Sequence, residues 1–242
     1  MRRLVCHPHL LFINGRFIMN TRIIAFVALV IFSIPALCSA EKSRPGPYVS
    51  AFIGASMPND QTVSSYDYYF GQAFSDDASF NTGVYTGFTG GYDFGYLRLE
   101  GELAYRYNEI DSITDRFNGV KFQGVNGDVG VFSTMFNMFF DIHNSSPVTP
   151  YLGGGFGFAS MYLSDTTGNG LLLYGEGYDT AFAYQFGAGV DIALNRNMSL
   201  DLGYRYFMTD DANFESDYYY SPVTASFKYE SHNVAVGFKF KF

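Results

Sequence analysis

Apolar residues alternate with small or charged residues along the last ten positions of the chain, 233–242. One face of an extended strand there would carry Val234, Val236, Phe238, Phe240 and Phe242, and the other face Asn, Ala, Gly and Lys. Successive side chains of a strand point to opposite sides of the sheet. A strand of about ten residues with one apolar face is the unit that crosses a membrane within a closed barrel. The alternation therefore predicts a membrane-spanning strand.

The same alternation recurs upstream and predicts eight strands, at residues 48–57, 82–92, 96–107, 128–142, 150–163, 180–194, 198–209 and 233–242. Short turns follow the second, fourth and sixth strands, and long polar segments follow the first, third, fifth and seventh. An up-and-down meander places short turns at one end and long loops at the other. The predicted fold is all-β: an eight-stranded antiparallel up-and-down transmembrane β-barrel with four long outer loops.

The alternation is compatible with two opposite barrels, because a soluble barrel carries its apolar face inside. The non-aromatic face here is mostly Gly, Ala and Ser, whereas a water-exposed surface would be rich in Lys, Glu and Thr. The chain also contains 26 Phe and 20 Tyr. An eight-stranded barrel is just wide enough to be filled by side chains, so these rings would overfill it. We therefore place Phe, Tyr and Leu against lipid.

Charged residues on the opposite face would then project into the lumen. Eight of them fall there: Arg98, Glu100, Glu102, Arg106, Asp191, Asp201, Arg205 and Lys239. Buried charges persist only when they are paired. Because four of the eight are basic and four are acidic, we predict near-complete pairing, a salt-bridged plug, and at most a small conductance.

The first 40 residues have a different character from the rest. Arg22 precedes an apolar run at 23–37, and small residues follow at 38–40. A basic start, a short apolar core and a small residue at the cleavage site are typical of a secretory signal peptide. The run is shorter than the roughly 20 residues of a spanning helix. We predict a signal peptide at 1–40, with Met19 as an alternative start, a linker at 41–46 and the barrel at 47–242.

Composition excludes several kinds of site. Both cysteines lie in the predicted signal peptide, so the mature chain has no disulfide and no cysteine-based metal site, and we expect neither a metal nor a cofactor. Without residues 1–40, Lys and Arg number 11 against 23 Asp and Glu, which gives a net charge of −12. Phosphate contacts need cationic patches. We therefore expect no nucleic-acid partner.

Five segments carry a resemblance to a known group: 96–107, 147–159, 182–191, 200–206 and the terminal Phe242. Together they resemble the small bacterial outer-membrane β-barrels of the opacity-protein/OmpX-like superfamily over about residues 47–242. The resemblance implies a location in the bacterial outer membrane, among its lipid and lipopolysaccharide. It also implies that the barrel-assembly machinery reads the terminal strand, with Phe238, Phe240 and Phe242 as the insertion signal. Members of the group include adhesins, surface antigens and structural barrels.

The long loops suggest how such a barrel would act. They hold many acids and the candidate contact residues Tyr66, Tyr68, Tyr69, Tyr218, Tyr219 and Tyr220. Tyrosine provides contact area at low entropic cost and is typical of recognition surfaces. We predict a structural or adhesive surface protein that binds a host or extracellular ligand through these loops. A rival interpretation is that the acids only keep the loops solvated, or bind divalent cations at the lipopolysaccharide layer.

Two further functions are weighed against adhesion: a narrow pore of low conductance and a lipid-modifying enzyme. Glu230, Ser231 and His232 are residue types found in hydrolases, but neighbours on a strand point apart and cannot act as nucleophile and base. A catalytic partner from another strand stays open at this stage. The glycines at 153–157 lack the lysine of a phosphate loop, and close packing in a narrow barrel explains them better. We therefore predict a non-enzymatic protein.

Overall fold

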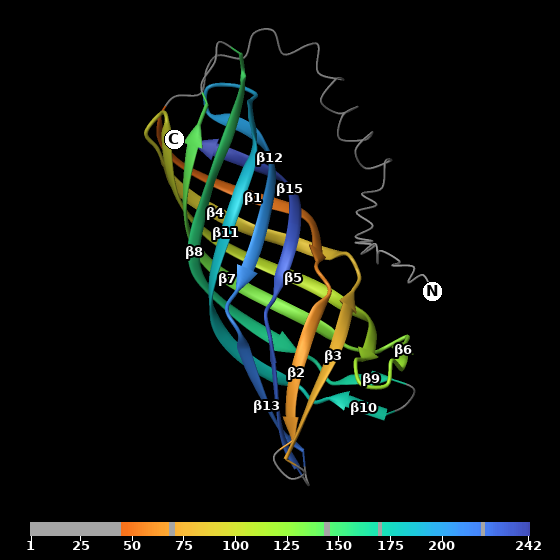
Figure 1. The fold of residues 1–242 in the computed structure, drawn as a ribbon. Helices are drawn as coiled ribbons and strands as arrows, with labels where there is room; N and C mark the ends of the chain where they lie inside the picture. Colours follow the sequence, from red (N-terminus) through yellow and green to blue (C-terminus); the bar gives the residue numbers. More distant parts are fainter. Residues whose placement is uncertain (1–44, 68–70, 143–145, 169–170, 219–220) are drawn as a thin grey trace, which may run out of the picture. The chain divides into compact units, whose positions relative to one another are not determined.

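Eight long strands form one closed ring (Figure 1). The computed structural model describes residues 45–67, 71–142, 146–168, 171–218 and 221–242. The ring consists of β1 (Gly46–Pro58), β4 (Gly83–Asp93), β5 (Leu97–Asp115), β7 (Asp128–Asp141), β8 (Val148–Leu163), β11 (Gly177–Ala193), β12 (Met198–Thr209) and β15 (Glu230–Lys241). Every strand pairs antiparallel with both of its neighbours. This confirms the predicted eight-stranded barrel.

Pairing between β1 and β15 closes the ring. Their register runs from Tyr48 opposite Lys241 to Pro58 opposite Ser231. Backbone hydrogen bonds extend this seam at both ends, from Asn59 N to the Glu230 carbonyl at 3.0 Å and from Phe242 N to the Pro47 carbonyl at 3.1 Å. The seam therefore joins the first and last strands along their full length.

The predicted strand bounds agree with the observed ones to within three residues, except at the end of β5, which continues to Asp115. Residues 1–44, with the predicted signal peptide and most of the linker, lie outside the described residues. Within the part of the chain that the structure describes, no helix has the length and apolarity needed to cross a membrane.

Tight turns join β4 to β5 and β11 to β12 at one end of the barrel. In the first, Asp93 Oδ1 accepts a hydrogen bond from Gly95 N at 2.7 Å, and Gly95 adopts a positive φ of 103°. In the second, Asn195 Oδ1 accepts from the backbone N of Asn197 and of Met198, both at 2.9 Å. Side-chain caps of this kind are typical of Asp and Asn in turns.

The long connections at the other end differ from the prediction, because they contain strands and are not irregular loops. The additional strands are β2 (Gln61–Asp67), β3 (Gln72–Phe80), β6 (Lys121–Gln123), β9 (Thr166–Gly168), β10 (Leu171–Tyr174), β13 (Ala212–Tyr218) and β14 (Ser221–Phe227). β13, β14, β2, β3 and the end of β5 form one continuous sheet, seen at the lower end in Figure 1. We call β2, β3, β13, β14 and residues 109–115 of β5 the β-extension.

The aromatic and aliphatic faces of the ring strands point outward, as predicted. Phe88, Leu103, Phe136, Phe158 and Phe186 are between 46% and 67% exposed in the isolated chain. An exposed apolar band of this extent is compatible with lipid and not with water. The barrel therefore has the predicted orientation of its faces.

The rule has exceptions, and they correct the prediction that aromatic side chains face lipid. Among the described residues, eight aromatic rings are buried, and five of them belong to ring strands: Tyr48, Tyr85, Phe139, Tyr151 and Phe207. Each of these five is out of step with its outward-pointing neighbours, so the period of two places it in the lumen. The narrow interior accommodates them because small residues lie on the facing strands.

The buried interior has two chemically distinct parts. Towards the short turns it is charged and polar. Towards the β-extension it is an apolar layer formed by Val131, Met135, Met161, Ala183 and Phe207, all fully or almost fully buried. The same cluster continues between the strands of the β-extension, with Val63, Ala78, Ile110, Ile113, Phe214 and Phe227. The β-extension thus has an apolar core that is continuous with the barrel.

Glycines on the inner face provide the room for the buried rings. A Cβ atom at Gly153 would lie 2.0 Å from the Met138 carbonyl oxygen and 2.7 Å from Cδ1 of Phe139. A Cβ atom at Gly189 would lie 2.4 Å from the Tyr151 hydroxyl. These contacts are too short for any side chain, so glycine is required at both positions for steric reasons.

We expect Gly153→Ala to impair barrel folding, and Gly101→Ala, on the lipid-facing side of β5, to leave it intact. The nearest atom to a Cβ at Gly101 is 3.7 Å away. Overpacking costs about 1–3 kcal/mol. The measurement is the fraction of heat-modifiable, folded protein on gels after refolding in detergent. Equal folded fractions for the two variants would contradict this account of the inner glycines.

Candidate functional site

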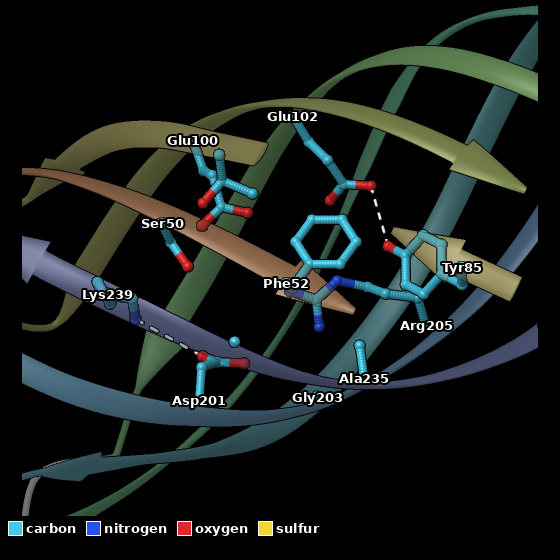
Figure 2. Close-up of a pocket in the computed structure, with 12 residues that line it drawn as sticks. Ser50, Phe52, Tyr85, Glu100, Glu102, Asp201, Gly203, Arg205, Ala235 and Lys239 are labelled. Carbon is cyan, nitrogen blue, oxygen red and sulfur yellow. Dashed lines mark hydrogen bonds and ion pairs between the residues drawn. The ribbon is translucent and has the colours of Figure 1, made fainter. Parts of the chain in front are cut away.

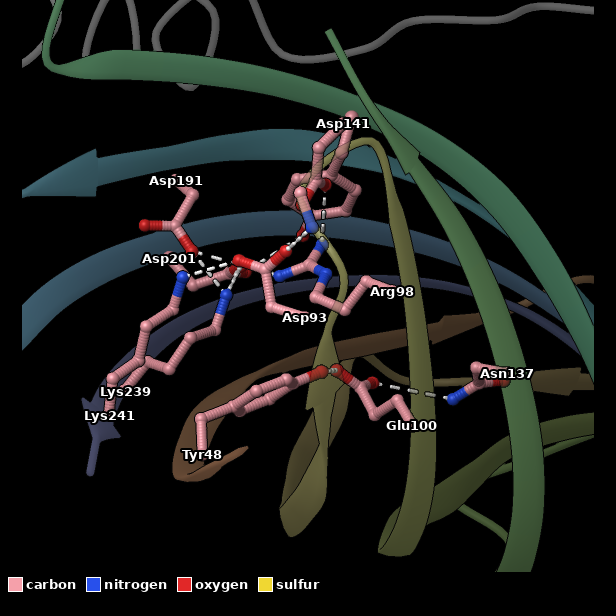
Figure 3. A network of polar contacts seen from close by, with 12 residues as sticks. Tyr48, Asp93, Arg98, Glu100, Asn137, Asp141, Asp191, Asp201, Lys239 and Lys241 are labelled. Carbon is pink, nitrogen blue, oxygen red and sulfur yellow. Dashed lines mark hydrogen bonds and ion pairs between the residues drawn. The ribbon is translucent and has the colours of Figure 1, made fainter. Parts of the chain in front are cut away.

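Arg98 of β5 is at the centre of the ionic network inside the lumen (Figure 3). Its guanidinium is 2% exposed and lies 3.4 Å from Asp141 and 3.7 Å from Asp191. The guanidinium also lies over the Tyr151 ring, 4.5 Å from its centroid. Planar stacking and ion pairing together suit arginine better than lysine at a buried position. One side chain of β5 therefore contacts both the neighbouring strand β7 and the distant strand β11.

Two lysines of the last strand complete this network. Lys239 forms an ion pair with Asp191 and lies 3.6 Å from Asp201. Lys241 donates to Asp93 Oδ2 at 2.5 Å, next to the turn between β4 and β5. Breaking a buried pair leaves an uncompensated charge. The ionic contacts of β15 therefore connect the final strand to both sides of the lumen.

Glu100 and Glu102 accept hydrogen bonds from neutral groups. Tyr48 donates to Glu100 at 2.7 Å. The second carboxylate accepts from Tyr85 at 3.2 Å, as drawn in Figure 2, and from the side-chain amides of Asn137 and Gln185 at 3.0 and 3.1 Å. Buried carboxylates are tolerated when their oxygens are hydrogen-bonded in this way.

Arg106 and Arg205 are held mainly by aromatic rings. Arg106 is fully buried, 3.8 Å from the centroid of the Phe207 ring, and donates one hydrogen bond to Ser133 at 2.9 Å. Arg205 lies over Phe139 at 4.5 Å and contacts the Tyr151 hydroxyl at 3.4 Å. Cation–π contacts are strongest where water is excluded.

These contacts correct the prediction of near-complete pairing among the eight lumen charges. Within the described residues, ion pairs join Arg98, Asp191, Asp201 and Lys239, whereas Glu100, Glu102, Arg106 and Arg205 form none within 4 Å. The physical reason is that tyrosines and amides donate hydrogen bonds to the two glutamates, whereas the two guanidinium groups lie against aromatic rings. The interior is therefore a mixed polar and ionic plug.

Sequence reasoning missed several members of this plug: Tyr48, Asp93, Asn137, Asp141, Tyr151, Gln185 and Lys241. Asp93 falls in the turn after the predicted strand 82–92, Asp141 falls inside the predicted strand 128–142 without a lumen role, and the tyrosines were counted as lipid-facing. Their position in the period of two was the available signal, because Tyr151 is out of step with Leu152 and Phe156. Position along the alternation, more than residue type, identifies lumen residues.

The lumen leaves little free space. A cavity of about 30 Å³ lies among Ser50, Glu100, Glu102, Arg205 and Lys239, at the level drawn in Figure 2. This volume suffices for only a few water molecules. The apolar layer closes the lumen towards the β-extension. Side chains therefore fill most of the lumen at this level.

The C-terminal aromatic residues lie on the outer face or at its end. Phe238 is 46% and Phe242 is 72% exposed, and the rings of Phe240 and Phe242 make an edge contact at 5.3 Å. The backbone of Lys241 is fixed by the Asn197 side chain, which donates to its carbonyl at 2.8 Å. A role for these rings in insertion stays a prediction.

The tyrosines predicted as ligand contacts are only partly described. Tyr66, in β2, is 42% exposed. Tyr218 ends β13, while Tyr68, Tyr69, Tyr219 and Tyr220 lie outside the described residues. Other apolar side chains are exposed at the same end of the molecule, notably Phe117 at 97% and Phe74 at 48%. The exposed surface of the β-extension thus includes aromatic residues that sequence reasoning did not select.

Ser231 and His232 point to opposite sides of the barrel wall. Ser231 is fully buried and its hydroxyl accepts a hydrogen bond from Asn233 at 3.1 Å. His232 lies on the outer face, where its Nδ1 is 2.7 Å from the Tyr204 hydroxyl. A nucleophile and its base must be within hydrogen-bond reach. These two residues do not form a catalytic pair.

Comparisons with known proteins agree with this architecture. The family model described as "Outer membrane protein beta-barrel domain" matches residues 24–242. The outer membrane protein PagN of Salmonella typhimurium is 26% identical over 239 residues, covering 90% of this chain and 98% of PagN. Among solved structures, the outer membrane protein OprG from Pseudomonas aeruginosa has a TM-score of 0.57 at 15% identity, covering 84% of this chain and 99% of OprG.

The solid-state NMR structure of the outer membrane protein AlkL gives a TM-score of 0.52 at 16% identity, covering 86% of this chain and 94% of AlkL. The two structural likenesses show the fold, and the family match together with the likeness to PagN places the eight strands in the bacterial outer membrane. In barrels of this class the short turns face the periplasm and the long connections face outward. The β-extension is therefore on the cell surface.

We expect Lys239→Met to destabilise the barrel by about 3–5 kcal/mol, because it removes the lysine that pairs with Asp191 and Asp201 and leaves Asp191 only its longer contact with Arg98. The measurement is urea unfolding in lipid vesicles. Adding Asp191→Asn to Lys239→Met should recover part of the loss. Lys121→Met, at an exposed position of β6, is the matched control and should be near neutral. A loss as small as that of the control would contradict the proposed network.

Planar-bilayer recordings should show no stable channels in the nanosiemens range for the wild-type protein. The double variant Met135→Ala, Met161→Ala thins the apolar layer, so its conductance should rise, since apolar constrictions block ions by excluding water. Met138→Ala is the control, because Met138 faces lipid and is 41% exposed. Large wild-type channels would show that the lumen is open.

Proposed function

We propose that this chain, which belongs to the outer membrane protein β-barrel domain family, is a structural and adhesive surface protein that makes its contacts through the β-extension. The observation that carries the proposal is the β-extension itself. Four strands beyond the membrane pair with one another and with β5 and enclose apolar residues. A protein with only a structural role in the membrane does not need an ordered sheet of this kind outside it.

Exposed aromatic residues support a recognition role for the β-extension and the loop beside it. Tyr66 and Phe74 project from β2 and β3, and Phe117 follows β5 in a turn where it is almost fully exposed. Large apolar side chains on an otherwise polar surface mark contact sites. An ordered scaffold also lowers the entropy lost on binding.

Charge restricts the class of partner. Segments 59–81, 108–128, 164–179 and 210–230 contain sixteen Asp and Glu and three Lys and Arg. Two of the three bases are already engaged, Arg116 with Asp77 at 3.0 Å and Lys228 with Asp211 at 3.8 Å. The surface therefore favours a basic partner, such as a cationic region of a host or matrix protein, over an anionic one.

The two rival functions have less support. A pore requires a continuous aqueous path, and the polar plug and the apolar layer lie in series across the lumen. A lipid-acting hydrolase requires a nucleophile and a base that meet, and Ser231 and His232 point apart. We therefore propose a non-enzymatic function.

Bacteria that display the double variant Tyr66→Ala, Phe117→Ala should adhere about tenfold less to epithelial monolayers and to wells coated with basic matrix protein. A tenfold loss corresponds to about 1.4 kcal/mol, which is within the range found when contact aromatics are truncated. Surface amounts are matched by immunoblot of the heat-modifiable form.

The matched control is Tyr92→Ala, Phe94→Ala, which removes the same residue types, 45% and 57% exposed, at the periplasmic end. It should leave adhesion unchanged. If the surface variant adhered like the wild type, the structural role would stand alone and the adhesive role would be refuted.

A further inference from the structure

The barrel wall has an interruption just beyond the end of the β1–β15 seam. The last backbone hydrogen bond of the seam joins Asn59 N to the Glu230 carbonyl, and pairing resumes only at Ser64 opposite Ser226, between β2 and β14. Residues 60–63 and 227–229 do not pair with each other in between. An open depression with a volume of about 440 Å³ lies at this interruption. Its volume is within the range of ligand pockets, roughly 300–1,000 Å³.

Part of this pocket is held in place by neighbouring groups. The Glu230 carboxylate accepts hydrogen bonds from Asn59 at 3.3 Å and from the Tyr206 hydroxyl at 2.9 Å. The Gln61 side chain donates to the Asn59 carbonyl at 3.1 Å. Hydrogen bonds therefore hold Asn59, Gln61 and Glu230 of the lining in place.

The pocket lies at the height of the outer membrane interface. Directly below it on the same outer face are Tyr206 and His232, whose rings are 4.9 Å apart, and Tyr204. Below these begins the apolar stripe of β15 with Val234, which is 43% exposed. Tyrosines in this position mark the boundary between hydrocarbon and head groups. A ligand here would lie among lipid head groups or just outside them.

The lining selects the chemistry of that ligand. Asp60, Asp211 and Glu230 contribute three carboxylates against one cation, Lys228, which already pairs with Asp211. The net negative charge disfavours phosphate and sulfate groups. Phe227 is the only apolar residue of the lining, so acyl chains have no apolar wall to contact. Amide, hydroxyl and carboxylate groups both donate to and accept from hydroxyl groups.

We propose that this pocket binds a saccharide, neutral or amine-bearing, through hydrogen bonds to its hydroxyl and amino groups. The sugar has two potential sources, the head group of a glycolipid beside the barrel and a soluble glycan. Neither Tyr66 nor Phe117 lines the pocket, so we expect its occupation to be independent of the proposed adhesion.

The test uses full-length mature protein in a detergent without a sugar head group, because glucoside and maltoside detergents would compete. Isothermal titration is carried out with three probes: cellobiose, the amine-bearing disaccharide of chitosan, and a sulfated disaccharide. The first two should bind and the third should not. Binding of the amine-bearing probe should be the tighter of the two because of the surrounding carboxylates.

Two variants test the location. Thr62→Trp places an indole at the exposed wall of the pocket and should abolish binding. Asp60→Asn should weaken binding of the amine-bearing probe about tenfold. Asp111→Asn, at an exposed position of β5, should leave the affinity for this probe unchanged. Heat-modifiable migration verifies that each variant is folded. Failure of the wild type to bind cellobiose and the amine-bearing probe, or undiminished binding by folded Thr62→Trp, would overturn the proposal.

A final arm identifies the source of the sugar. The protein is reconstituted in vesicles with or without lipopolysaccharide, and the amine-bearing probe is titrated into both. If lipopolysaccharide blocks the probe in the wild type, the ligand is the glycolipid head group. If the probe binds equally in both vesicles, the pocket serves a soluble glycan. Adhesion of Thr62→Trp bacteria should remain normal, which separates this result from that of Tyr66→Ala, Phe117→Ala.

Discussion

Closure of the backbone hydrogen-bond ladder is the constraint on which the rest of this structure depends. Lipid provides no partner for an exposed N–H or C=O group, so every spanning strand must be paired on both sides. The last pairing to be satisfied joins β1 to β15, residues that are nearly two hundred positions apart in the chain. The ring is complete only when β15 is in place. The same strand therefore provides the seam, an outward apolar face and two inward-pointing lysines.

Closing eight strands leaves a narrow interior, and the sequence fills it by matching large residues with glycines. Tyr151 occupies the space opposite Gly189 and Gly203, and Arg205 occupies the space at Gly187. The run of inner glycines is thus the steric complement of the buried rings and arginines. The rings in turn cover the guanidinium groups that have no carboxylate partner. The same side chains therefore determine both the packing and the electrostatics of the lumen.

Strict alternation made much of this fold predictable. Eight strands, their bounds, the outward face and the inward position of residues such as Arg98 follow from a period of two. The interaction partners of these inward residues cannot be predicted from the alternation, because a pair such as Lys241 and Asp93 depends on the relative heights of distant strands. The β-extension was missed for a similar reason. Segments such as 61–67 and 221–227 are short and rich in polar residues. They form strands because they pair with each other in the folded protein.

The separation of charge along the barrel axis then determines which partners are compatible with the surface. Inside the lumen, acids and bases nearly balance: Arg98, Arg106, Arg205, Lys239 and Lys241 face Asp93, Glu100, Glu102, Asp141, Asp191 and Asp201. Almost all of the net negative charge is consequently on the outer segments. At physiological salt such a field extends about 8 Å, so it acts on partners close to the surface. An anionic glycan would be repelled there, whereas a basic protein or an uncharged sugar would not.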